Sequence, residues 1–183
     1  MVSPGPRLIA TAGLQAAREI AAAVPDPELP MVTLADLGIL RGVAAVGEQL
    51  VVTITPTYSG CPALREIAHD LRYRLSQAGF ADVAVRTELA PAWSSDWITA
   101  EGRRKLRAAG IAPPSPAPPG PAPGQARHGP VPLTLTPARR EPVACPRCGS
   151  SETTQTAAFS GTACKALFRC DACREPFEYV KEI

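Results

Sequence analysis

The chain has 183 residues, 21 of them proline, and 19 Lys and Arg against 17 Asp and Glu, a formal net charge of +2. That length allows one ordinary domain, alone or with a small satellite. So small a charge excludes nucleic-acid binding by electrostatic attraction alone, and no apolar stretch approaches the roughly 20 residues that span a bilayer. Five of the six cysteines follow residue 142. We find no signal-type apolar segment, so we expect reduced cysteines and a cytoplasmic protein with no membrane partner.

Residues 1–112 carry the periodicities of a small α/β domain of order α-β-β-α-β. Apolar spacing places its helices and strands, in turn, at 14–24, 39–46, 49–55, 62–78 and 83–89. Gly47 and Glu48 separate the first two strands, which is the length of a tight hairpin turn. The strand–helix–strand that follows predicts a right-handed crossover and therefore a parallel pair of strands.

A short helix over 99–109 and a proline-rich linker over 113–142 are expected next. Trp93 and Trp97 precede that helix, and we interpret them as a cover for the sheet. Eleven of the 21 prolines lie in the linker, together with very few large apolar side chains, so it cannot form a packed core. We expect an extended, mobile segment that lets the C-terminal part work apart from the first domain.

Residues 143–183 hold two Cys-x₂-Cys pairs, which are Cys145 with Cys148 and Cys170 with Cys173. Two tight turns of this kind close a tetrahedral four-thiolate site, which favours Zn²⁺ or a single iron. Alternating segments between and after the pairs predict short strands, and so small a unit needs its metal to fold. We predict a structural zinc ribbon, with iron as the alternative ion. Two disulfides or four free thiols are the less favoured interpretation.

Two cysteines stand outside these pairs. Cys164 has no partner at ligand spacing, and it is either a small buried residue or a thiol that exchanges iron. Cys61 lies at the predicted start of a helix, where backbone N–H groups favour the thiolate. Acidic residues on nearby loops, Asp26, Glu28 and Asp36, could reach the same end of the sheet. These groups could hold iron or an iron–sulfur cluster transiently; an inert, buried Cys61 is the alternative.

Conventional catalysis by Cys61 is not expected. A cysteine nucleophile needs a general base, and the two histidines, His69 and His128, fall on the polar face of a predicted helix and in the linker. The chain also lacks the helices of a di-iron site and the fingerprints of flavin or nicotinamide binding. We therefore expect an accessory subunit without chemistry of its own.

Several segments resemble known families. Asp26–Pro30 (DPELP), Asp36–Gly38 (DLG) and Thr53–Pro62 (TITPTYSGCP) resemble the metal–sulfur cluster assembly domain of SufT-like and MIP-type proteins. Five further segments resemble one family more specifically, the PaaD (PaaJ) subunit of the phenylacetyl-CoA epoxidase system. These segments are 91–98, 102–114, 145–150, 163–170 and 175–177.

The resemblance implies an accessory or assembly subunit of the multicomponent 1,2-phenylacetyl-CoA epoxidase, which acts in phenylacetate catabolism and aromatic compound degradation. In that family the oxygen chemistry belongs to a di-iron monooxygenase subunit, and a subunit of this type aids iron or iron–sulfur cluster delivery. We therefore expect other epoxidase subunits as partners, and a homodimer is also compatible with the family. We further expect iron or an iron–sulfur cluster to bind transiently at Cys61. A structural docking subunit with no metal-transfer role is the alternative.

Overall fold

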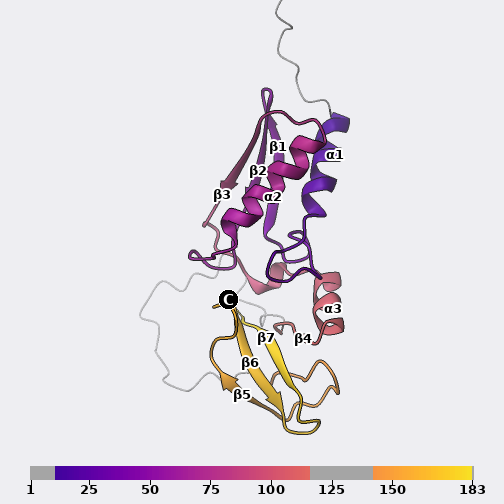
Figure 1. The fold of residues 1–183 in the computed structure, drawn as a ribbon, viewed down its shortest axis with the longest axis vertical. Coiled ribbons are helices and arrows are strands. Elements are labelled where there is room, and N and C mark those ends of the chain that lie inside the picture. The colour runs from indigo at the N-terminus through magenta and orange to yellow at the C-terminus, as the bar shows by residue number, and fades with distance from the viewer. Residues whose placement is uncertain (1–10, 116–141, 183) are drawn as a thin grey trace, which may run out of the picture.

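The structure, a computed structural model, describes residues 11–115 and 142–182. Most of the predicted linker therefore lies outside the described residues. The elements follow in this order: α1 Thr11–Ala22, β1 Leu40–Val46, β2 Gln49–Ile54, α2 Leu64–Gln77, β3 Val83–Thr87, the short 3₁₀ helix η1 Ser95–Trp97, α3 Ala100–Ala108, β4 Ile111–Ala112, β5 Thr153–Ala157, β6 Lys165–Cys170 and β7 Pro176–Val180. Two sheets result, one on each side of α3 (Figure 1).

The first sheet has the order β1-β2-β3, and its pairing confirms the predicted topology. β1 and β2 are antiparallel and are joined through Gly47, whose φ of 64° suits the predicted tight turn. β2 and β3 are parallel, with α2 as the crossover between them. Gly79 closes α2 at a φ of 94°, a conformation that glycine adopts without a steric penalty.

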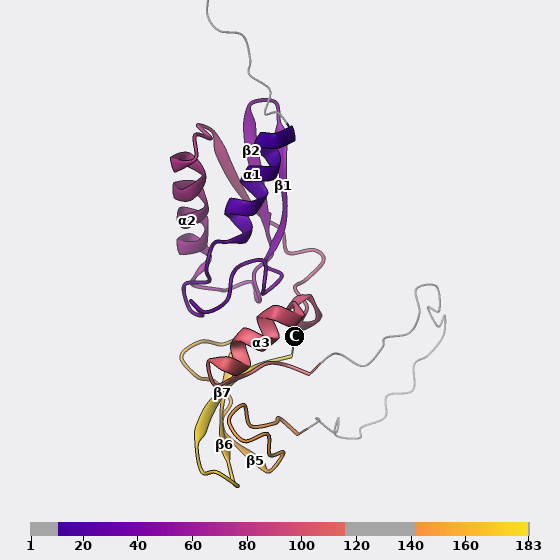
Figure 2. The ribbon, with the colours of Figure 1, turned by 90° about the vertical axis from the view of Figure 1, so that its right-hand side faces the viewer.

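The core of this part lies between its helices and one face of β2. Alternate residues of β2 point to the same side, and Leu50, Val52 and Ile54 are all buried there. α1 and α2 pack against each other and bring their buried side chains to this face (Figure 2). The described helices include none long and apolar enough to cross a membrane.

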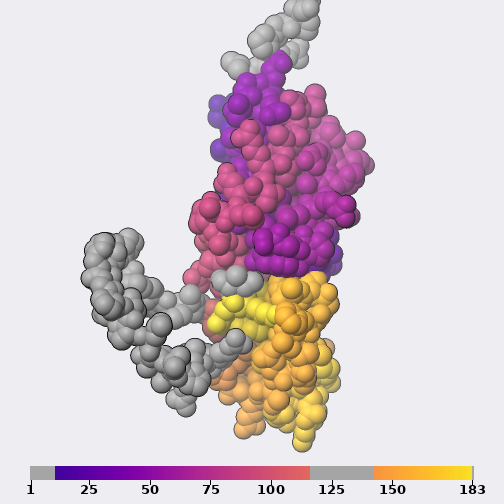
Figure 3. Space-filling view, turned by 90° about the vertical axis from the view of Figure 1, so that its left-hand side faces the viewer, coloured from indigo at the N-terminus to yellow at the C-terminus, as the bar shows by residue number. Residues whose placement is uncertain are grey.

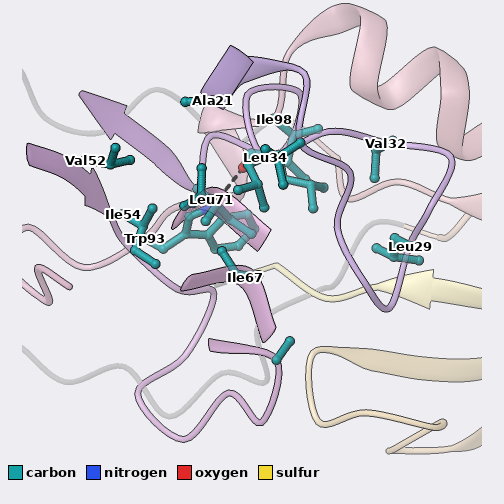
Figure 4. Close-up of a cluster of buried hydrophobic side chains, with 14 of the residues drawn as sticks. Ala21, Leu29, Val32, Leu34, Val52, Ile54, Ile67, Leu71, Trp93 and Ile98 are labelled. Atoms are coloured by element: carbon teal, nitrogen blue, oxygen red, sulfur yellow. Dashed lines mark hydrogen bonds between the residues drawn. The ribbon is translucent and has the colours of Figure 1, made fainter. Parts of the chain in front are cut away.

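Trp93 lies within this core rather than over it. Its side chain is buried, and its indole N–H donates to the backbone carbonyl of Leu37 at 2.9 Å (Figure 4). Trp97 is half-buried, and the guanidinium of Arg41 lies 3.6 Å from its ring centroid. Of the two tryptophans, only Trp97 thus fits the expected role of a cover.

The second sheet has the order β4-β7-β6-β5 and includes a strand from before the linker. β4 pairs in parallel with β7, so Ile111 and Ala112, which the sequence assigned to the first domain, extend the sheet of the ribbon. Ala112 shares a small apolar cluster with Cys145, Cys170 and Phe177. The chain therefore enters the ribbon before the linker and returns to it afterwards.

The two parts are in contact. Val180 of β7 and Ile111 of β4 belong to the same buried cluster as the side chains of α1, α2 and β2. The space-filling view shows the ribbon abutting the first part (Figure 3). The expectation that the ribbon works apart from the first domain does not hold in this arrangement, because burial of Val180 joins the two cores.

Gly102 fixes where α3 packs. A Cβ at this position would lie 2.6 Å from the backbone oxygen of Asp36, whereas a Cβ at Gly42 of β1 would meet nothing within 4 Å. Gly102→Ala should lower the free energy of unfolding by about 1–3 kcal/mol, because the backbone of the Asp36 loop cannot yield as a side chain does.

Gly42→Ala is the matched control and should be neutral or slightly stabilising, since alanine in a strand loses less conformational entropy than glycine. Denaturant unfolding of both variants measures the difference. Equal stability of the two variants would contradict the close packing of α3.

Candidate functional site

The four paired cysteines of the ribbon converge on one point. Their sulfur atoms all lie within 4.8 Å of one another, with 3.8 Å between Cys145 and Cys173 and 3.5 Å between Cys148 and Cys170. Zinc–sulfur bonds of about 2.3 Å in a tetrahedron separate the sulfurs by about 3.8 Å. The donor set therefore fits one tetrahedral metal ion, with every position filled by protein.

The turns that present these sulfurs are alike. In the first, the N–H of Gly149 donates to the carbonyl of Cys145 at 2.9 Å, and Gly149 has a positive φ of 76°. In the second, the N–H of Arg174 donates to the carbonyl of Cys170 at 3.0 Å, and Arg174 takes a φ of 69° without being glycine. Each turn thus holds its two thiols on the same side.

Two of these thiols, Cys170 and Cys173, differ strongly in pKa. The backbone N–H of Cys173 donates to the sulfur of Cys170 and helps to lower the pKa of Cys170 to about 7. The N–H of Glu175 favours a thiolate at Cys173, yet burial and the neighbouring sulfurs outweigh it and raise the pKa of Cys173 to about 12. A bound cation would replace the shared protons and remove this competition.

Cys61 lies elsewhere, in a small cavity where the first part meets the ribbon. The cavity has a volume of about 20 Å³ and an apolar wall that includes Trp93 and Val180. The polar groups that line it come from both parts of the chain, namely Asp26, Glu28, Thr57, Cys61, Cys164 and Lys181. The structure thus brings Asp26 and Glu28 to Cys61, as the sequence led us to expect.

The loop after α1 fixes the two carboxylates. Asp26 is buried and accepts hydrogen bonds from the N–H groups of Glu28 and Leu29, both at 2.9 Å. Burial nevertheless raises the pKa of Asp26. Burial, and then the carboxylate of Asp26, raise the pKa of Glu28, while a hydrogen bond with Thr162 of the ribbon acts in the opposite direction. Two acidic groups therefore share a poorly solvated site.

The thiol of Cys61 differs from the expectation. The N–H of Ala63 faces its sulfur and favours the thiolate, but burial outweighs this contact, and the acidic groups Glu28, Asp26 and Cys164 add to the effect. The pKa of Cys61 is therefore raised rather than lowered. The sequence shows the N–H groups of the helix start and the acidic loops, but it does not show the burial of the thiol, which is the largest cause of the raised pKa.

Cys164 is the functional candidate that the sequence left unplaced. It lies in the turn before β6, and its sulfur is 3.0 Å from the hydroxyl of Thr162. Six residues along a strand span about 20 Å, so Cys164 is far from Cys170 and from the ribbon's metal site. Its pKa is raised, chiefly by burial. Only the packing of the ribbon on the first part explains its position beside Cys61.

Asp36 does not join this group. Its carboxylate accepts a hydrogen bond from the Lys105 ammonium at 2.7 Å and another from the backbone N–H of Thr33 at 3.0 Å. These bonds outweigh burial and lower the pKa of Asp36. Its side chain connects the loop after α1 to α3 and does not line the cavity.

A larger hollow, of about 410 Å³, lies on the ribbon itself. Aromatic side chains, Phe168 and Tyr179, form part of its wall, and its charged residues are Lys181 and Glu182. The described residues that line it include no thiol and no group of acidic residues. Within the described parts of the chain, only the ribbon's four cysteines are close enough to one another to hold a metal ion, while the junction cavity collects further thiol and carboxylate groups.

Comparisons with known proteins agree with this division. Residues 15–86 match the family model "Iron-sulfur cluster assembly protein", and residues 130–181 match "PaaD zinc beta ribbon domain". A protein of Escherichia coli (strain K12), named as a putative subunit of 1,2-phenylacetyl-CoA epoxidase, is 44% identical over 158 residues, which are 86% of each chain. The chain belongs to the PaaD family. Its ribbon is the zinc ribbon of that family.

Other relatives match about half of this PaaD-family chain. An "Fe-S protein maturation auxiliary factor" of Porphyromonas gingivalis is 34% identical over 85 residues, 45% of this chain and 80% of the relative. A solved structure of a DUF59 domain from Bacillus anthracis is 28% identical, with a TM-score of 0.48, and covers 52% of this chain and 92% of its own.

The ribbon of this PaaD-family protein should depend on its four thiols. Cys170→Ser should abolish stoichiometric metal binding and expose residues 143–182 to protease, because the free energy of metal binding is what folds so small a unit. Metal analysis with limited proteolysis measures both effects. Cys164→Ser is the matched control and should keep the ribbon metal. Stoichiometric ribbon metal in a Cys145→Ser/Cys170→Ser double variant would contradict the assignment.

Proposed function

We propose that this protein aids the delivery of iron, as an ion or a cluster, to the 1,2-phenylacetyl-CoA epoxidase complex, with Cys61 as the ligand that carries the cargo. The observation behind this is the cavity in which a thiol and two carboxylates face one another. The likeness to an epoxidase subunit supports the destination, and the likeness to a maturation factor supports the kind of cargo.

The donors suit a transient ligand set. Thiolate and carboxylate oxygen together bind divalent transition metals, and within the described residues none of the three groups is committed to an ion pair with a Lys or Arg of its own. We propose Cys61 with Asp26 and Glu28 as this set. We leave Asp36 out of it, since its carboxylate is held by Lys105.

The ribbon takes a structural role in this proposal. We propose that Zn²⁺ fills its four-cysteine site, because four thiolates in a tetrahedron leave no position for a substrate. Its remaining surface then serves to dock onto other subunits of the epoxidase. The homodimer expected from the sequence stays a prediction.

A structural docking subunit with no metal transfer is the second candidate. The observation that favours it is the raised pKa of Cys61, which leaves the thiol protonated and poorly reactive in the absence of a cation. The two candidates predict opposite results for the removal of this one sulfur.

Cys61→Ala tests delivery in cells that grow on phenylacetate. The variant should stay folded with its ribbon metal bound, because Cys61 is only half-buried and lies far from the four paired cysteines. The epoxidase purified from these cells should contain severalfold less iron and convert phenylacetyl-CoA correspondingly slowly.

Ser59→Ala is the control, since Ser59 is exposed on the same loop and does not line the cavity. It should leave the iron content unchanged. Normal iron and activity with Cys61→Ala would remove the delivery role and leave the docking role.

A further inference from the structure

Two thiols from different parts of the chain line the same cavity. Cys61 follows β2 in the first part, and Cys164 precedes β6 in the ribbon. Neither belongs to the four-cysteine site of the ribbon. Because they are 103 positions apart in the sequence, only the packing of the two parts places them together.

Contacts within the ribbon hold Cys164 in place beside the junction. The hydroxyl of Thr162 lies 3.0 Å from its sulfur and also bonds to the carboxylate of Glu28. The backbone N–H of Lys181 donates to the carbonyl of Cys164 at 2.9 Å. Thr162 therefore couples the thiol of the ribbon to a carboxylate of the first part.

The cavity is the size of an ion. Its volume of about 20 Å³ has room for about one sphere the size of a water molecule. An iron–sulfur cluster contains at least two iron atoms with bridging sulfides and needs more room than this volume. A single transition-metal ion does.

We propose that Cys61 and Cys164 together ligate one divalent transition-metal ion at the junction of the two parts, with Glu28 as an oxygen ligand. This rests on the proposed function and sharpens it, since the cargo is then a single ion, Fe²⁺ in the cell, and the ribbon takes part in holding it. On binding, each thiol forms one metal–sulfur bond and gives up one proton to solvent, and no electron is transferred.

Part of the charge of such a complex is offset nearby. One divalent cation with two thiolates and the carboxylate of Glu28 leaves a single negative charge, to which an ionised Asp26 would add a second. The ammonium of Lys165 acts electrostatically on Asp26, Glu28 and Cys164, and it lies 2.9 Å from Glu178 on its other side. The site thus offers a neutralising cation that is itself anchored in the ribbon.

The spacing of the donors distinguishes this site from the ribbon's. Among the described residues, only the four ribbon cysteines already lie within 4.8 Å of one another. No three of the described junction donors meet that spacing, so an ion must draw the donors of this cavity closer together. A site that closes only around its ion releases it more easily than one preformed to tetrahedral geometry, and this suits cargo.

Cobalt is the probe for this site. Full-length protein with zinc in its ribbon should be titrated anaerobically with Co²⁺, which does not displace zinc from four thiolates. We expect one cobalt per chain, with a thiolate-to-cobalt charge-transfer band. Because the intensity of this band follows the number of thiolates bound, Cys164→Ser and Cys61→Ser should each halve the band per cobalt. Each should also weaken cobalt binding at least about tenfold.

Ala163→Ser, a change at the exposed neighbour of Cys164, is the matched control and should leave the band unchanged. A second measurement needs no variant. Bound cobalt should protect both Cys61 and Cys164 of the unaltered protein from alkylation, as read by mass spectrometry.

Protection of Cys61 alone, or an unchanged band in Cys164→Ser, would overturn the shared site and leave Cys61-dependent delivery standing. Reconstitution of a stable cluster with stoichiometric sulfide on Cys61 would overturn the single-ion cargo. Absence of cobalt binding by the unaltered protein would overturn the site altogether, while the cellular test of Cys61 still decides delivery.

Discussion

Burial of Val180 in the core of the first part is the contact on which the arrangement of the molecule depends. The side chain is 4% exposed and belongs to the cluster that contains the inward faces of β2 and α2. The next residue, Lys181, binds the backbone carbonyls of Cys164 and Ala163. The same segment that joins the cores therefore positions the turn that carries Cys164. Separation of the parts would open the cavity and remove one of its two thiols.

The molecule consequently has two kinds of cysteine site with different energetics. In the ribbon, backbone turns place four sulfurs at the spacing of a tetrahedral ion. At the junction, burial raises the pKa of both thiols and of Asp26 and Glu28, so the charged forms of these groups are harder to reach there than in water. On the function we propose, the first design suits a structural metal and the second a metal that is carried as cargo.

Local patterns in the sequence predicted the elements and the ribbon's cysteines, because turns, periodicity and Cys-x₂-Cys spacing are short-range signals. Asp26 and Glu28 were also placed correctly, since their loop is short and begins at the end of a helix. Asp36 was not, because its partner Lys105 is 69 positions away. Neither the raised pKa of Cys61 nor the role of Cys164 could be read from the sequence. The raised pKa follows from burial and from the nearby Glu28 and Asp26, whereas the position of Cys164 follows from the packing of the ribbon on the first part.

The pairing of β4 with β7 changes what the proline-rich segment does. Ala112 on its N-terminal side and Val143 on its C-terminal side lie in the same apolar cluster, so both ends are attached to one small sheet. The segment therefore closes a loop on the ribbon and is not a tether whose length sets the distance between two bodies. Its closure entropy changes only by about 0.6 kcal/mol for each doubling of length. Chain length in this region is thus nearly free to vary, while the position of the ribbon stays fixed by its packing.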